Sequence, residues 1–178
     1  MKYFVNKYQY GPKEVEESMG AWWLRKYLLP LLALLAMFLV FATAAAVSAN
    51  AVWLVPGVTG FFGFLMFIVR ERQAVGREKE NIVRTYHVSD PFMRVEIDHE
   101  IRTVVSNTRN SIPLAGVEGV IVTKHMIVLQ LSHDMSLGLK KDSFERGTAE
   151  ECLAFMKEQA EKNRKDRKEF SRKKKNKK

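Results

Sequence analysis

The sequence predicts an α+β membrane protein: a hairpin of two transmembrane helices combined with a small antiparallel β-barrel or sandwich that ends in a C-terminal helix. Three observations predict this class. Residues 27–69 contain no Asp, Glu, Lys, Arg or His. From Met93 onward, apolar and polar residues alternate with the period of two that is typical of strands. Apolar residues then recur over 149–160 with the spacing of a helix.

The apolar run is too long for one membrane crossing and long enough for two, because about 20 apolar residues span a bilayer core. The break should lie near Asn50, the most polar residue of the run. We therefore expect transmembrane helices over about 27–48 and 52–69. Their connection is only a few residues long, so the two helices must be antiparallel neighbours.

Small residues recur on both expected helices and permit close packing in lipid. Gly57, Gly60 and Gly63 mark the second helix, and the outer end of the first is rich in alanine. Our first interpretation is a tight hairpin with these faces together. The alternative is that the glycines form a seam between two copies of the chain.

Basic residues flank the apolar run on both sides. Arg25 and Lys26 precede it, Arg70 and Arg72 follow it, and the connecting turn has no charge. Because cytoplasmic loops carry the excess of Lys and Arg, both termini of this multi-pass protein should be cytoplasmic.

Two rival interpretations of the apolar run are weaker. Val47-Ser48-Ala49 resembles a signal-peptide cleavage site, but acidic residues precede the run and a second span follows at once. A transporter or channel usually carries ionisable residues inside the membrane, and this run has none. The sequence therefore favours an anchor.

Residues 1–11 are rich in β-formers and should form one strand, which Gly11-Pro12 ends. A single strand is not stable alone. We therefore expect it to join the sheet that follows the hairpin, so that the hairpin is an insertion within the soluble domain. Residues 12–86 should form a helical segment that contains the hairpin and a juxtamembrane helix. A strand over 82–88 is the alternative for its end.

Residues 93–162 should form the cytoplasmic β domain with its closing helix. Closely spaced turns, including one over 107–110, indicate a meander of short antiparallel strands. Thr148 and Glu151 have the spacing of a capping box at the start of the helix. On the apolar face of that helix, Cys152 should be a small buried hydrophobe rather than a reactive thiol. The expected strands cover 93–97, 101–106, 111–114, 117–122, 126–132 and 135–139.

The sequence contains no recognisable catalytic or metal-binding motif. The histidines His87, His99, His125 and His133 do not have metal-ligand spacing with one another, with Cys152 or with an acid. Glycine-rich phosphate loops, Gly-x-Ser-x-Gly and Cys-x-x-Cys are also absent. We therefore expect no catalytic residue, no metal, no cofactor and no enzymatic activity.

Residues 163–178 should be a disordered basic tail. The net charge of the chain is +9, and residues 161–178 alone hold eleven basic against three acidic residues. The tail is either a solvated segment that reinforces topology or a contact to anionic lipid. We do not expect nucleic-acid binding, because stacking aromatic residues are lacking around the basic run. The candidate lipid contacts are Arg172, Lys173, Lys174, Lys175, Lys177 and Lys178.

The order of these segments resembles that of the YcxB-like family of bacterial membrane proteins. The matching parts are 93–106, 112–118, 120–132 and 139–144, before the closing helix. The resemblance implies a pleckstrin-homology-like (PH-like) β domain and a place in the bacterial cytoplasmic (inner) membrane. It implies no activity and no catalytic residues.

The leading functional hypothesis is a non-enzymatic membrane protein that presents its cytoplasmic PH-like domain for binding. The partner would be another protein, a second copy of the chain in a homo-oligomer, or lipid head groups. The alternative is an accessory subunit of a larger membrane assembly, such as a transporter or secretion complex, recognised through its hairpin. An enzyme acting on a membrane substrate is the third hypothesis.

Overall fold

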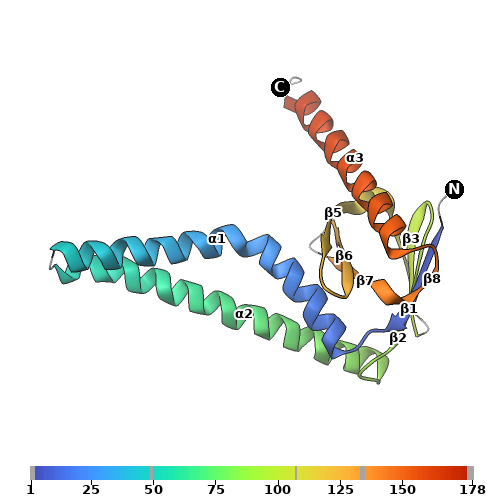
Figure 1. Cartoon of the computed structure of the whole chain (residues 1–178), viewed down its shortest axis with the longest axis horizontal. Coiled ribbons are helices and arrows are strands. Elements are labelled where there is room, and N and C mark those ends of the chain that lie inside the picture. The colour runs from blue at the N-terminus through green and yellow to red at the C-terminus, as the bar shows by residue number, and fades with distance from the viewer. Residues whose placement is uncertain (1–2, 49, 107, 133–134, 176–178) are drawn as a thin grey trace. The chain divides into compact units, whose positions relative to one another are not determined.

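The computed structural model describes residues 3–48, 50–106, 108–132 and 135–175. The chain forms two compact units (Figure 1). Residues 23–78 make up the helical unit, and residues 1–22 with 79–178 make up the β unit. The elements of the β unit are β1 (Phe4–Gln9), β2 (Phe92–Ile97), β3 (Glu100–Val105), β4 (Thr108–Pro113), β5 (Val117–Val122), β6 (Met126–Leu131), β7 (Ser136–Lys140), β8 (Phe144–Arg146) and α3 (Ala149–Lys175).

Two long helices provide the helical unit. They are α1 (Pro12–Ser48) and α2 (Leu54–Tyr86), joined through a short 3-10 turn over Ala51–Trp53. The first turns of α1 and the last of α2 belong to the β unit. Both helices are long and apolar enough to cross a membrane, by length and composition. Since α2 continues to Tyr86, the alternative strand over 82–88 is wrong.

The glycines of α2 lie against α1, and the two helices run side by side (Figure 1). A Cβ atom on Gly60 would lie 3.2 Å from the carbonyl oxygen of Leu34 and 2.7 Å from the Met37 methyl carbon. A Cβ atom on Gly57 would lie 3.4 Å from that of Phe41. Gly57 and Gly60 therefore face α1 inside the hairpin, as the first interpretation expects.

All strands of the β unit pair in antiparallel fashion, in two sheets. The five-stranded sheet has the order β4-β3-β2-β1-β8, and the three-stranded sheet has the order β5-β6-β7. The N-terminal strand β1 lies inside the larger sheet, paired with β2 along its whole length and with β8 on its other side. The ladders do not join the two sheets, so no barrel is closed.

Two parts of the larger sheet differ from the sequence prediction. The predicted turn over 107–110 is wrong, because β4 begins at Thr108, opposite Val105. The chain turns earlier because Ser106 adopts a left-handed conformation with φ of 52°. The sequence analysis also missed β8, which has only three residues and one apolar side chain, too few for a periodic signal.

Side chains of β1 make the connection between the sheets that the ladders do not make. The Asn6 amide nitrogen donates to the Lys140 carbonyl at 2.7 Å, and the Lys140 backbone N–H donates to the Asn6 side-chain oxygen at 3.1 Å. The Tyr8 hydroxyl donates to the Gly138 carbonyl at 2.7 Å. Burial raises the pKa of Tyr8 well above 10.0, so this hydroxyl keeps its proton. Asn6 and Tyr8 thus bond the free edge of β7.

The start of α1 is bound to the three-stranded sheet by two carboxylates. Glu17 accepts hydrogen bonds from the Thr123 hydroxyl and, at 2.8 Å, from the backbone N–H of His125. Glu14 pairs with the Lys140 ammonium at 2.9 Å. Burial by itself would raise the pKa of both carboxyls, but these hydrogen bonds outweigh it and hold the pKa below 4.5. Both groups are therefore ionised at neutral pH.

Helix α3 closes the β unit. Its capping box is confirmed: the Thr148 N–H donates to the Glu151 carboxylate and the Glu151 N–H donates to the Thr148 hydroxyl, each at 3.2 Å. Cys152 is fully buried with Met156 in the core, as predicted. Burial raises the pKa of the Cys152 thiol to about 12, so it stays protonated and unreactive at neutral pH.

The structure differs from the predicted disordered tail, because α3 continues through Lys175. The side-chain amide of Asn163 is buried and donates to the carbonyls of Leu114 at 2.7 Å and Val117 at 2.9 Å. Arg167 pairs with Glu118 one turn later. These bonds extend the docked part of the helix beyond its apolar stripe. Residues 176–178 lie outside the described residues.

Replacing Asn6 with alanine should destabilise the β unit by about 2 kcal/mol, because it leaves the Lys140 backbone N–H and C=O without their partner. Thermal unfolding of the full chain in mild detergent measures the loss. Gln9→Ala, on the exposed side of the same strand, is the matched control and should change little. Equal stability of the two variants would contradict the bridging role of Asn6.

Gly60→Ala and Gly76→Ala form a matched pair on α2. A methyl group on Gly60 would meet the α1 backbone, whereas one on Gly76 would meet nothing within 4 Å. Gly76→Ala should therefore gain up to about 1 kcal/mol from helix propensity, and Gly60→Ala should lose stability. Denaturation of both variants in micelles, followed by circular dichroism, tests this. A stabilised Gly60→Ala would refute the close approach of α1 and α2.

Candidate functional site

The histidines and acidic residues of the described chain do not gather into a metal-binding cluster. Within the described ranges, no group of three or more His, Cys, Asp or Glu side chains could hold a metal ion. His87 and His125 are exposed. His99 is exposed too, with its Nδ1 atom 3.1 Å from Asp98. His133 lies outside the described residues.

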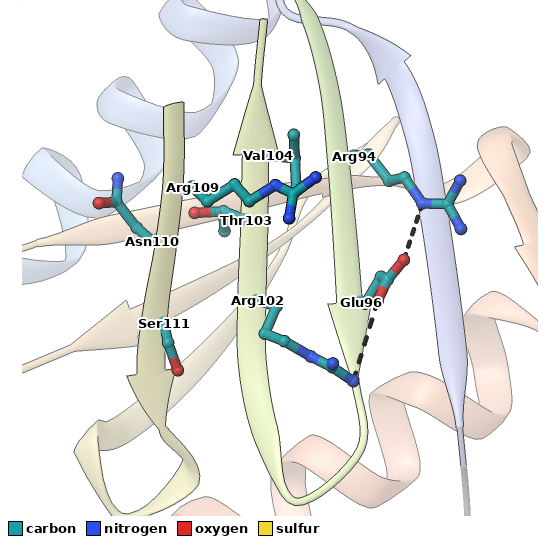
Figure 2. A pocket seen from close by; sticks show the side chains of 8 residues that line it. All are labelled: Arg94, Glu96, Arg102, Thr103, Val104, Arg109, Asn110 and Ser111. Carbon is teal, nitrogen blue, oxygen red and sulfur yellow. Dashed lines mark hydrogen bonds and ion pairs between the residues drawn. The ribbon is translucent and has the colours of Figure 1, made fainter. Parts of the chain in front are cut away.

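A hollow of about 510 Å³, lined mostly by charged and polar residues, lies on the outer side of β2, β3 and β4 (Figure 2). Alternation along a strand places successive side chains on opposite faces of the sheet. Val95 and Ile101 point into the core, so their neighbours point outward. We call this outward surface the arginine face; it consists of Arg94, Glu96, Arg102, Val104, Arg109 and Ser111.

The register of the strands arranges the arginine face in two rows. Arg94 lies opposite Val104, which lies opposite Arg109 on β4. Glu96 lies opposite Arg102, which lies opposite Ser111. One row therefore has a cation at each end and an aliphatic side chain between them.

Two of the three arginines have carboxylate partners. The Arg94 Nε atom lies 2.9 Å from Glu96. The Arg102 guanidinium lies 2.6 Å from Asp98 and within 4 Å of Glu96 and Glu100. The backbone N–H groups of Glu100 and His99, with Arg102, hold the pKa of Asp98 below 3.8. The charge of Arg102 is therefore compensated within the fold.

Arg109 has no such partner. Among the residues that the structure describes, no carboxylate lies within 4.0 Å of its guanidinium and no hydrogen bond reaches it. Figure 2 shows its side chain lying across β3 beside Val104. This uncompensated cation, on an exposed strand, is the chemically available group of the arginine face.

The predicted lipid-contact residues lie elsewhere, at the end of α3. Arg172 and Lys173 are exposed on its last turns, and Lys174 and Lys175 complete the helix. Lys177 and Lys178 lie outside the described residues. The structure brings Arg172 to a second hollow of about 540 Å³, whose other lining residues are Glu118, Arg164, Arg167, Lys168 and Ser171.

The sequence analysis did not find the arginine face. Its signal was the alternation of charged residues in β2 and β3, which was used only to recognise strands. Arg109 was assigned to a turn, and a turn residue carries no expectation of sharing a sheet face with Arg94. The pairing register brings these side chains together, and one sequence does not specify which strands are neighbours.

Comparisons of the chain with protein-family models, with curated proteins and with solved structures find no match. The resemblance to the YcxB-like family therefore stays a prediction from the residues that carry it.

The two arginines should differ in their effect on stability. Arg102→Gln should destabilise the β unit by up to about 1 kcal/mol, because it leaves three neighbouring carboxylates without their shared cation. Arg109→Gln should change the free energy of unfolding by less than about 0.5 kcal/mol. Thermal unfolding of both variants gives the answer, and a larger loss for Arg109→Gln would show that its charge serves the fold.

Proposed function

We propose that this protein is a non-enzymatic binding protein anchored in the membrane by α1 and α2. The observation that carries the proposal is the exposure of apolar surface along both helices. Leu29 is 79% exposed, Val47 90% and Phe62 60%. No residue of the most apolar window of α1 is buried. A core helix of a soluble protein, in contrast, is mostly buried. A bilayer is the solvent in which such a surface is stable, since apolar area in water costs roughly 25 cal/mol per Å².

Charge supports a topology with both termini in the cytoplasm. Arg25 and Lys26 stand at one end of the apolar run and Arg70 and Arg72 at the other, with no charge in the connection between the helices. Trp22 and Trp23 stand beside the first pair and Trp53 at the far end of the hairpin, positions typical of the two membrane interfaces. The β unit would then work at the cytoplasmic side.

The resemblance to the YcxB-like family adds the bacterial inner membrane and a PH-like type for the β unit. Two antiparallel sheets around one core, followed by a closing helix, support that type. The exposed basic end of α3 supports a secondary contact with anionic lipid, at about 1 kcal/mol per basic residue near the surface.

Binding is favoured over catalysis by the character of the surface. The arginine face offers an uncompensated cation beside aliphatic and hydroxyl groups, and it holds neither a histidine nor a cysteine. Such a surface recognises charge and shape, and its one described hydroxyl–carboxylate contact, between Ser111 and Glu100, lies on the exposed strand β4. We propose a protein partner as the occupant of this surface. Recognition of the hairpin by a larger membrane assembly is the second candidate, and the exposed apolar side chains of α2 favour it.

Reporter fusions and extraction test the anchor together. Fusions at both ends of the full chain should report cytoplasm, whereas a fusion after Asn50 should report the opposite side. The chain should also stay with membranes in alkaline carbonate and leave them only in detergent. A periplasmic C-terminus would refute the topology, and release by carbonate would refute the anchor. A stable partner that co-purifies through the hairpin would favour the accessory-subunit alternative.

A further inference from the structure

The two sheets have four edges, and three of them are short, hydrogen-bonded by side chains or packed against a helix. On β7, Asn6 and Tyr8 bond the backbone of Lys140 and Gly138. On β5, helix α3 packs against the strand, and the side chains of Asn163 and Arg167 donate to its first carbonyl, at Val117. The edge strand β8 has three residues and pairs with β1 through an irregular register.

The edge at β4 differs from the other three. All six residues of β4 pair with β3 in a continuous register. In the described part of the chain, no backbone hydrogen bond reaches the other side of β4. Every residue of the strand except Ile112 is exposed. An edge strand of this kind presents a row of alternating N–H and C=O groups to an incoming strand, up to Pro113, which has no N–H.

The charge beside this edge selects the incoming strand. A strand added to β4 would extend the row formed by Arg94, Val104 and Arg109 by one residue. That residue would lie directly opposite Arg109, whose guanidinium has no carboxylate partner in the described structure. An opposite charge at such a cross-strand position stabilises the pair, and a like charge destabilises it.

We propose that the β4 edge binds an extended acidic segment of a protein partner as an additional antiparallel or parallel strand, with an acidic side chain placed on Arg109. Backbone hydrogen bonds to β4 supply most of the affinity, and Arg109 selects for acid over base. This inference rests on the proposed binding function and names the surface and the chemistry of the partner.

Two other occupants fit the edge less well. A second copy of the chain could offer its own β4, but Thr108–Pro113 contains no Asp or Glu. Pairing β4 with itself would leave both copies of Arg109 uncompensated. A lipid head group carries the negative charge, but it offers no row of N–H donors to the outward carbonyl groups of β4.

The test uses the full chain in nanodiscs of phosphatidylcholine, whose surface carries no net charge. The probe is a fluorescent ten-residue peptide with glutamate on one strand face and threonine and valine on the other, and fluorescence anisotropy measures its binding. We expect saturable binding that weakens with added salt. A peptide with lysine in place of glutamate should not bind. Two further peptides are N-methylated on alternate amides, one on the odd-numbered and one on the even-numbered residues. Only one of these sets of amides would face β4, so one of the two peptides should lose binding and the other should keep it.

Variants at Arg109 connect the binding to this edge. Arg109→Gln should raise the Kd by up to about fivefold, and Arg109→Glu by about tenfold or more. Lys124→Gln, which removes an exposed cation from the turn between β5 and β6, is the matched control and should leave the Kd unchanged. Circular dichroism of the same nanodisc samples establishes that each variant is folded and inserted.

Four outcomes would overturn the inference. They are absence of peptide binding to the folded chain, binding unaffected by Arg109→Glu, binding that tolerates both N-methylated peptides, and Arg109-dependent binding of phosphatidylglycerol vesicles in place of peptide. Dimerisation lost in Arg109→Glu, without peptide binding, would identify a second copy as the occupant. None of these outcomes alters the reporter and carbonate results, so failure of this inference is distinguishable from failure of the anchor.

Discussion

The pair of hydrogen bonds between the Asn6 side-chain amide and the Lys140 backbone is the constraint on which the β unit depends. The two sheets share no ladder, so side chains of β1 connect them, and Tyr8 adds a third bond at Gly138. An amide side chain can do this because it carries a donor and an acceptor in the same plane, like the peptide group it replaces. Since β1 precedes the two long helices and its partner β2 follows them, the β unit is complete only when both ends of this insertion lie together.

This arrangement determines which surfaces are available. β1 bonds the edge of β7, and α3 bonds the end of β5 through Asn163 and Arg167. The remaining long edge is β4, where the sheet ends in exposed polar residues. Carboxylates already neutralise Arg94 and Arg102, whereas Arg109 carries a charge that the described structure does not compensate. The contacts within the fold thus leave this strand and this cation exposed.

Sequence reasoning was most accurate where the signal is local. Period-two alternation located β2, and the closely spaced turns located β3, β5, β6 and β7, each within a residue or two; the spacing of Thr148 and Glu151 located the start of α3. It failed where a residue's role depends on a distant partner. Thr108–Asn110 is polar enough for a turn, yet pairing with β3 makes it strand. Residues after Asn163 lack an apolar stripe, yet bonds from Asn163 and Arg167 to β5 and its flanking residues keep this part of α3 docked.

The sequence by itself determined the division into an apolar helical pair and an antiparallel β unit, the β propensity of the first ten residues and the burial of Cys152. Each follows from hydrophobicity and period over a short stretch of chain, because local periodicity decides which face of an element avoids water. Only the tertiary structure decided that β1 lies between β2 and β8 and that Arg94 and Arg109 share one face. Strand order and register arise from contacts between residues far apart in sequence, so no local pattern contains them.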